Sequence, residues 1–258
     1  MLTQAQLHTF LQEIGIKPSD TVLVHTSMRA LGEAEGGCDG LIDGFISYLT
    51  EGLFVVPTHT WANVGVKNPV FDVRITVPCI GALPTVAAFR KDAVRSLHPT
   101  HSVAAFGKRA AEFVRGEELA CSPCPAGGVW QRLYDEDAKI LLLGVGLDKN
   151  TYIHAVDEMV DVPNRLKLPI SLTVIDQDGK CHALSYCKHG NAGSEYFENY
   201  RKPLELCGAL RTAELHGAKV GIFYVKTATV MLKKLWAKAE YDLCQGFREI
   251  PEAYYLGE

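Results

Sequence analysis

Residues 141–158 read LLLGVGLDKNTYIHAVDE and carry the clearest structural signal in the chain. Three consecutive leucines predict a buried strand, the Gly-Val-Gly after them predicts a turn, and the remaining residues have the spacing of a helix. We expect this helix to span residues 150–161 and to pack its apolar side on a sheet. Its polar residues fall on one stripe of the helix surface: Asn150, His154, Asp157, Glu158 and Asp161.

Working outward, the neighbouring segments repeat the alternation of strands and helices. Short apolar runs at residues 21–25 and 53–57 predict buried strands, with helical patterns between and after them. An Asp-Gly turn within residues 169–187 predicts a hairpin, whereas residues 58–78 are expected to form a long functional loop. This order predicts an α/β fold: a single-domain sandwich over residues 1–258, with a mixed central sheet flanked by helices.

Composition excludes several classes of function. The 258 residues are 47% hydrophobic and 22% charged with a net charge of −4, so no basic surface indicates nucleic acid. No segment reaches the ~18 apolar residues of a membrane span, and the N-terminus lacks the pattern of a signal peptide. The eight cysteines are therefore interpreted as reduced thiols. We expect a soluble cytoplasmic protein whose mildly acidic surface suits a cationic small molecule.

Motifs that the chain lacks narrow the chemistry further. It has no P-loop, no dinucleotide-binding glycine motif after a strand, no G-x-S-x-G elbow and no H-E-x-x-H. Nucleotide hydrolysis, nicotinamide chemistry, serine hydrolysis and zinc-dependent proteolysis are therefore disfavoured.

His154 is the candidate catalytic base. Carboxylates three and four residues downstream, Asp157 and Glu158, lie within reach along a helix. A carboxylate beside an imidazole fixes its tautomer and raises its basicity. The helix also follows the carboxyl end of a strand, where α/β proteins bind ligands. A solvated amphipathic helix with an exposed histidine explains the spacing equally well, so both interpretations stay open.

Two loops are candidate ligand contacts. Thr26, Ser27 and Met28 directly follow the first strand, where amides and hydroxyls can hold a phosphate or a pantetheine arm; an ordinary turn is the alternative. The loop at residues 95–102 suits an anion or a substrate through its arginine and hydroxyls. Its candidate residues are Ser96, His98, Thr100 and Ser102. No Cys, Asp or Glu nearby completes a zinc set with its two histidines, so no metal is expected.

Two further features are weaker signals of function. Asp72 lies beside an aromatic residue in the segment 68–74 and suits a cationic sugar, although it is equally consistent with a capped turn. Cys121 and Cys124 form a C-x-x-C that allows a redox function, but prolines and glycines around them favour incidental thiols.

Taken in order, these segments resemble the aminoglycoside 3-N-acetyltransferase family, whose antibiotic N-acetyltransferase fold is unrelated to the common GNAT enzymes. The resemblance covers roughly residues 20–165, with weaker likeness to about residue 240. It is carried by Val24–Gly32, Asn68–Leu83, Arg95–Gly107, Ser122-Pro123 and Leu141–Glu158.

The resemblance implies that acetyl-CoA donates its acetyl group directly to an amine in a ternary complex. In the family pattern T-x-x-H-x-x-E the histidine is the base, which corresponds to His154 in Thr151-x-x-His154-x-x-Asp157. Because Asp157 stands where the family has Glu and Glu158 follows, either carboxylate could orient His154. A histidine base agrees with the chemistry, since a protonated amine is not a nucleophile.

The resemblance also assigns the two loops and the remaining candidates. It implies that residues 26–28 contact the pantetheine arm of CoA and that residues 96–102 line the cofactor site. Substrate contacts are then expected at Asp72, Asn150, Thr151 and Asp161. No metal is needed, and a homodimer is compatible with the family although no sequence feature indicates an interface. The alternatives are acetylation of a different amine, a non-catalytic CoA-binding protein, and a thiol-redox protein.

Overall fold

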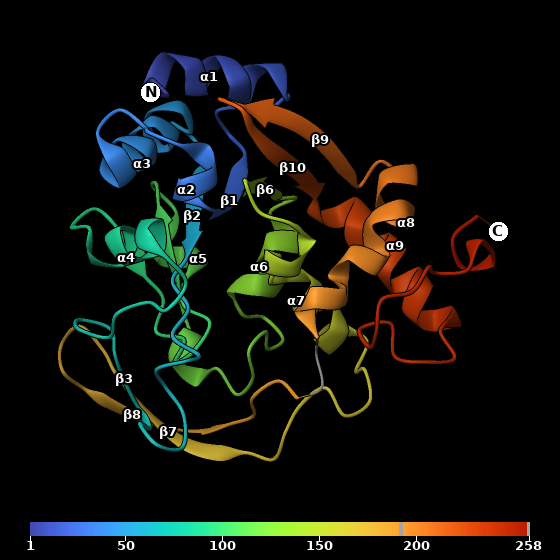
Figure 1. The fold of residues 1–258 in the computed structure, drawn as a ribbon. Coiled ribbons are helices and arrows are strands. Elements are labelled where there is room, and N and C mark those ends of the chain that lie inside the picture. Colours follow the sequence, from blue (N-terminus) through green and yellow to red (C-terminus); the bar gives the residue numbers. More distant parts are fainter. Residues whose placement is uncertain (191–192, 257–258) are drawn as a thin grey trace.

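In the computed structural model, residues 1–190 and 193–256 are described, and a seven-stranded sheet forms their centre (Figure 1). Its strands, in spatial order, are β4 (Val94–Arg95), β5 (Val103–Phe106), β2 (Leu53–Pro57), β1 (Thr21–Thr26), β6 (Lys139–Leu143), β10 (Ala218–Tyr224) and β9 (Leu210–Leu215). Strands β2, β1 and β6 are parallel, and the outer pairs are antiparallel. The sheet is therefore mixed, as predicted.

Each face of this sheet carries its own hydrophobic core because side chains alternate along a strand. On β1, Val22 and Val24 join the core of one face and Leu23 joins the other. The first face is covered by α1 (Gln4–Glu13), α3 (Gly37–Tyr48) and α4 (Ala82–Phe89). The second is covered by α5 (Ala110–Phe113), α6 (Val129–Asp135), α7 (Tyr152–Met159), α8 (Arg201–Leu206) and α9 (Val225–Lys238). This confirms the predicted sandwich of helices around a central sheet.

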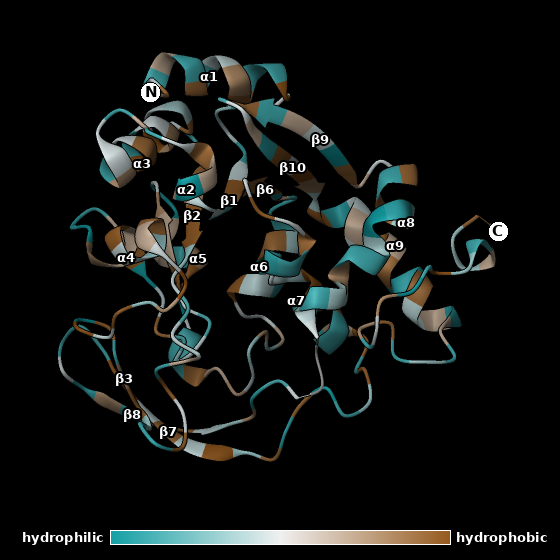
Figure 2. Ribbon diagram, viewed as in Figure 1, coloured by the Kyte–Doolittle hydropathy of each residue, from teal (hydrophilic) through white to brown (hydrophobic). Residues whose placement is uncertain are grey.

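Amphipathic patterning explains why these helices pack where they do. Hydrophilic and hydrophobic residues alternate around α1 in Figure 2, and the buried set Leu7, Phe10 and Leu11 has helical spacing. Thr3 caps this helix, since its side chain accepts from the amide of Gln6. The other helical elements of the described chain are α2 (Met28–Leu31) and four 3₁₀ turns, η1 (Glu117–Leu119), η2 (Leu147–Lys149), η3 (Ser194–Tyr200) and η4 (Glu252–Tyr254).

A second, three-stranded sheet lies at the bottom of Figure 1, away from α1. It contains β3 (Val70–Asp72), β7 (Ile170–Ile175) and β8 (Cys181–Tyr186). The predicted hairpin is confirmed as β7 and β8. The segment 58–78 is not the uniform loop that was expected, because β3 within it pairs with β7. The small sheet has a separate core of six buried residues, Val64, Phe71, Val73, Leu172, Val174 and Tyr186.

Among the described residues, no helix is both long enough and apolar enough to cross a bilayer.

Candidate active site

A cavity of about 1070 Å³ is lined by residues of both sheets, since its wall includes the ends of β1 and β2 and Tyr186 of β8. Its lining begins at the carboxyl ends of β1 and β6, the edge at which α/β sheets usually bind ligands. Further lining comes from α2, the start of α4, the start of α7 and the residues after β8. This volume lies at the upper end of the roughly 300–1,000 Å³ range of ligand pockets. The cavity can therefore hold a large ligand.

His154 lines this cavity from the first turn of α7. Its side chain is 12% exposed, and its Nδ1 lies 3.8 Å from Oδ2 of Asp157. Burial lowers the pKa of His154; His189 and Arg165 add to this effect, and Asp157 opposes it. The imidazole is therefore neutral near pH 7, which is the form a general base needs.

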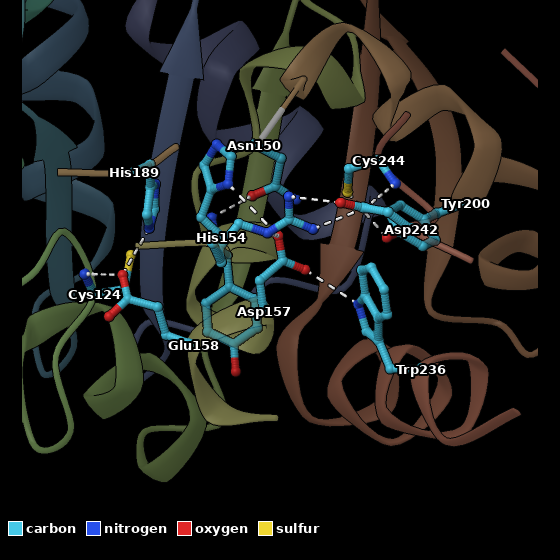
Figure 3. A network of polar contacts seen from close by, with 12 residues as sticks. Cys124, Asn150, His154, Asp157, Glu158, His189, Tyr200, Trp236, Asp242 and Cys244 are labelled. Carbon is cyan, nitrogen blue, oxygen red and sulfur yellow. Dashed lines mark hydrogen bonds and ion pairs between the residues drawn. The ribbon is translucent and has the colours of Figure 1, made fainter. Parts of the chain in front are cut away.

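Asp157 is fully buried behind His154 (Figure 3). Its Oδ2 lies 3.1 Å from Nε of Arg165, and its Oδ1 accepts a 3.1 Å hydrogen bond from the indole of Trp236. Arg165 also contacts Asp242 at 3.0 Å, and its guanidinium lies over the Trp236 ring. The negative charge of Asp157 is thus compensated mainly by Arg165. His154 lies farther from the same carboxylate, at 3.8 Å.

Glu158, the next residue, points into a different network. Its Oε1 lies 2.7 Å from Nε2 of His189 and accepts a 2.9 Å hydrogen bond from the amide of Cys124. The hydroxyl of Ser122 donates to Oε2. Glu158 therefore does not contact His154 directly. It holds His189, whose ring centroid is 4.5 Å from that of His154.

Because the helix is shorter than predicted, the other polar residues of the predicted stripe fall outside it, at its two ends. α7 begins at Tyr152 and ends at Met159, so it is shorter than the predicted span of 150–161. Asn150 and Thr151 precede it, are buried and line the cavity. Asp161 lies beyond its end, is exposed and does not line the cavity. Within the described chain the side-chain amide nitrogen of Asn150 has no hydrogen-bond partner.

The segment 26–28 lies in the cavity wall, as the sequence suggested. Ser27 accepts a 3.3 Å hydrogen bond from the amide of Ala30 and so caps α2. The hydroxyl of Thr26 is buried without a partner among the described residues. Gly144 faces this segment with φ of +66°, and a Cβ there would lie 2.5 Å from Cβ of Ala30. Only glycine fits this turn, which brings backbone and hydroxyl groups close to the cavity.

The loop 95–102 contributes less to the lining than expected. Thr100 and Tyr186 both line the cavity, and their hydroxyl groups are hydrogen-bonded to each other. Ser96, His98 and Ser102 are not part of the lining. Their side chains instead make hydrogen bonds that hold the loop in place. Nδ1 of His98 accepts from the amides of Thr100 and His101, and its Nε2 donates to the carbonyl of Ser122. The hydroxyl of Ser96 accepts from the amide of Val103, and that of Ser102 donates to the carbonyl of Thr58.

Asp72 lies apart from the cavity, at the end of β3. Its carboxylate is bound by Arg74 at 2.6 Å, and this hydrogen bond lowers the pKa of Asp72. The structure therefore matches the capped-turn interpretation of this residue and does not bring it to the other candidates.

Cys121 is exposed and Cys124 is buried, and both thiols are free. Burial raises the pKa of Cys124 well above its usual value, so this thiol is a poor nucleophile. Over residues 1–190 and 193–256, no group of three or more His, Cys, Asp or Glu side chains has the arrangement of a metal site.

Four further histidines lie in the cavity wall: His25, His59, His101 and His189. His101 belongs to the segment 96–102 that the resemblance assigned to the cofactor site, whereas the other three were not among the predicted site residues. Ring centroids are 4.6 Å apart for His59 and His101 and 5.9 Å apart for His101 and His189. His25 and His59 sit at the ends of strands β1 and β2, which is a signal that could have indicated them. His101 and His189 are placed by loops, and no local pattern marks the contact between them.

Comparison with known proteins gives one consistent result. Residues 23–237 match the family model described as aminoglycoside 3-N-acetyltransferase. Aminoglycoside N(3)-acetyltransferase IV of a Salmonella species is 30% identical over 189 residues, covering 72% of this chain and 69% of that protein. Aminoglycoside N(3)-acetyltransferase III of Serratia marcescens is 25% identical over 187 residues, covering 66% and 69%.

Solved structures share the fold. The aminoglycoside acetyltransferase AAC(3)-IVa superimposes with a TM-score of 0.75 at 26% identity, over 92% of this chain and 89% of that one. A histidine-to-alanine variant of AAC(3)-IVa, solved with a gentamicin, gives 0.76 at 27% identity over the same shares. The structure of AAC-IIIb with CoASH gives 0.78 at 19% identity, over 92% and 96%, and shows the same fold.

Proposed function

This chain belongs to the aminoglycoside 3-N-acetyltransferase family and is an acyltransferase, and from that premise we propose that it transfers the acetyl group of acetyl-CoA to an amine with His154 as general base. The observation that carries the proposal is His154 itself: a neutral imidazole, only 12% exposed, in the wall of a large cavity. The 3-amino group of an aminoglycoside is the first candidate acceptor, since this is what the relatives are named for. We propose that residues 1–258 form a single acetyltransferase domain of this family.

The residues around the cavity fit a thioester donor. Thr26 and Asn150 present buried polar groups that lack partners within the described chain, and both line the cavity. Because Gly144 has no side chain, nothing projects from this turn toward the segment 26–28, and an extended ligand can lie along it. We therefore assign the pantetheine arm to residues 26–28. Thr100 and Thr151 line the same cavity and remain candidates for contacts with donor and acceptor.

In the proposed mechanism His154 does the proton work. As the uncharged amine attacks the thioester carbonyl, His154 takes its proton and then returns it to the departing sulfur, so that the carbon–nitrogen bond forms as the carbon–sulfur bond breaks. Asn150 is the proposed donor to the oxyanion, because preorganised donors stabilise the charge that develops there. Nδ1 of His154 lies 3.8 Å from Oδ2 of Asp157, which is longer than a hydrogen bond. Catalytic hydrogen bonds are often long in a protein that holds no substrate. We expect this contact to shorten in the complex.

The two carboxylates then have separate roles. Asp157 orients His154 and is itself fixed by Arg165 and Trp236. Glu158 is a positioning residue that acts through His189, whose ring packs on His154. This division makes Asp157 the family-pattern partner of the base and gives Glu158 an indirect role.

One observation favours a second acceptor class, an amine other than an aminoglycoside. Asp148 is the only carboxylate among the described residues that line the cavity. An aminoglycoside carries several ammonium groups, and each of them favours a nearby carboxylate.

A thiol-release assay tests the proposed function. Purified protein is incubated with acetyl-CoA and each member of a panel containing aminoglycosides, amino sugars and simple amines, and free CoA is measured over time. We expect amine-dependent release in the wild type and loss of release in His154→Ala, while His8→Ala, a variant on α1, keeps it. Binding of CoA without thiol release for any amine would contradict the proposal and favour a non-catalytic CoA-binding protein.

A further inference from the structure

The charged side chains of the cavity wall are mostly cations. Arg29, Lys149 and Lys188 line it, against the single carboxylate of Asp148. Asp148 is also not free, since its Oδ2 lies 2.6 Å from Nζ of Lys149. A donor that carries phosphates accounts for cations in such a wall. The donor does not, however, explain why the described lining offers no free carboxylate. A polycationic acceptor would need such carboxylates to bind its ammonium groups.

Lys188 stands on the side of the cavity formed by the small sheet. It follows β8, and its Nζ donates to the carbonyl oxygens of Val64 at 2.9 Å and Trp61 at 3.3 Å. These two contacts leave one of the three ammonium protons for a ligand. Both of these partners are backbone carbonyls, and no ion pair between Lys188 and a carboxylate is found in the described part of the chain.

The surroundings of Lys188 supply no acidic group either. Trp61, Tyr186 and His189 line the cavity with it. The nearby carboxylate of Glu158 does not line the cavity, because Ser122, Cys124 and His189 already bind it. Residues 191 and 192, which follow in the chain, are Asn and Ala and bring no charge. A second ammonium group on the acceptor would therefore meet a like charge in this wall, which costs affinity and discriminates against polyamines.

We propose that the acceptor is a small amine that also carries an anionic oxygen group, a carboxylate or a phosphate, and that Lys188 binds this anion. The inference rests on the proposed acetyl transfer and decides between its two acceptor classes. One amine is acetylated at His154, and the anion at the other end of the molecule is held by Lys188. Polycationic aminoglycosides are then poor acceptors.

Four acceptors that differ only at carbon 6 test this inference. They are glucosamine 6-phosphate, 2-amino-2-deoxyglucuronic acid, glucosamine and 2,6-diamino-2,6-dideoxyglucose, which place a phosphate, a carboxylate, a hydroxyl and an ammonium on the same ring. Gentamicin serves as the polycation. We expect kcat/KM to be about tenfold to a hundredfold higher for the better anionic acceptor than for glucosamine, the range of a hydrogen bond to a charged group. The diamino sugar and gentamicin should fall below glucosamine.

Variants of Lys188 assign the effect to this residue. Lys188→Met should remove the preference for the anion, Lys188→Glu should invert it, and Lys188→Arg should retain it. The KM for acetyl-CoA should stay within about twofold in all three, and Lys108→Met, which alters a surface lysine, should behave as wild type.

Equal or better turnover of the diamino sugar or gentamicin by the wild type overturns the inference while leaving acetyl transfer intact. The same holds if Lys188→Glu keeps the wild-type order, or if the variants change only the KM for acetyl-CoA. Absence of thiol release with every acceptor, gentamicin included, contradicts the proposed function itself.

Discussion

Asp157 and Glu158 are adjacent in sequence, yet they belong to two different regions of the molecule (Figure 3). Asp157 faces Arg165, Trp236 and the C-terminal part of the chain, and its charge is buried and paired with that of Arg165. Glu158 faces the cavity side, where a hydroxyl, an amide and His189 bind it. His154 lies between the two regions.

The difference shows how one short helix serves both stability and chemistry. The ion pair of Asp157 and Arg165 lies behind the imidazole and is fixed in place by burial. Removal of Asp157 takes one carboxylate away from Arg165, whereas removal of Arg165 leaves the buried carboxylate of Asp157 without its cation. Glu158 is bound instead by a hydroxyl, a backbone amide and an imidazole, and no arginine or lysine contacts it among the described residues. We therefore expect changes at Asp157 to affect folding first and changes at Glu158 to affect turnover first.

The largest effect on stability is expected for Asp157→Asn. This change removes the carboxylate of Asp157 from Arg165 and leaves that of Asp242, in a site where the arginine side chain is 2% exposed. The free energy of unfolding should fall by about 3–5 kcal/mol, as is typical when one member of a buried pair is removed. Denaturant unfolding measures it. Asp161→Asn, an exposed carboxylate just beyond α7, should change it by less than about 0.5 kcal/mol; equal losses in the two variants would be incompatible with the backing role.

Acid should destabilise the cavity side next. Burial lowers the pKa of His25 to about 3 and that of His98 to about 4, and it lowers the pKa values of His59 and His101 well below 6.5. Below pH 6.5 the unfolded chain binds protons that the folded chain does not, so stability falls as the pH drops from 6.5 toward 4.

Each histidine contributes up to about 1.4 kcal/mol per pH unit in this window. Glu117 acts in the opposite sense, because burial raises its pKa to about 7. Unfolding curves recorded from pH 7 to pH 4 measure the net slope. His98→Gln should flatten it, since one of the histidines is lost, whereas an unfolding free energy that stays constant over this range would show that these histidines are not buried in the neutral form.

A smaller effect, on turnover, is expected for Glu158→Gln. A glutamine can keep the contacts to Cys124 and Ser122, but it removes the charge that holds His189. We expect kcat to fall about tenfold, less than the 10²–10⁴-fold contribution of a direct general base. The KM for acetyl-CoA and the midpoint of thermal unfolding should change little. A variant that loses stability as severely as Asp157→Asn would erase the distinction between the two carboxylates.

The smallest effect is expected at the C-x-x-C segment. Cys121 is exposed and takes part in neither network, so Cys121→Ser should leave thiol release within about twofold of wild type and unfolding within about 0.5 kcal/mol. Loss of activity in this variant would revive the redox interpretation.

The sequence predicted well wherever the determining residues are close together in the chain. The strand, turn and helix around residues 141–158 follow from apolar spacing and glycine, and the hairpin of β7 and β8 follows from its Asp-Gly turn. The edge strand β9 was missed, since its alternating polar residues resemble a loop. Strand β3 was missed as well, because its three residues gain strand structure only by pairing with β7.

The candidate site was predictable only in part, for the same reason. His154 and the segment 26–28 follow strand ends and could be found by position. The partner of Asp157 lies eight residues away in a loop, and Trp236 comes from the last long helix, so no local spacing indicates them. Lys188 and His189 reach the cavity because the small sheet folds over it. Their proximity to His154 is a property of the tertiary fold.

The most direct test of the central claim is the rate of CoA release by His154→Ala with the acceptor that the wild type uses best. We predict a fall in kcat of about 10²–10⁴-fold, with the KM for acetyl-CoA and the unfolding midpoint close to wild type. Turnover within a few fold of wild type would contradict the assignment of His154 as the base.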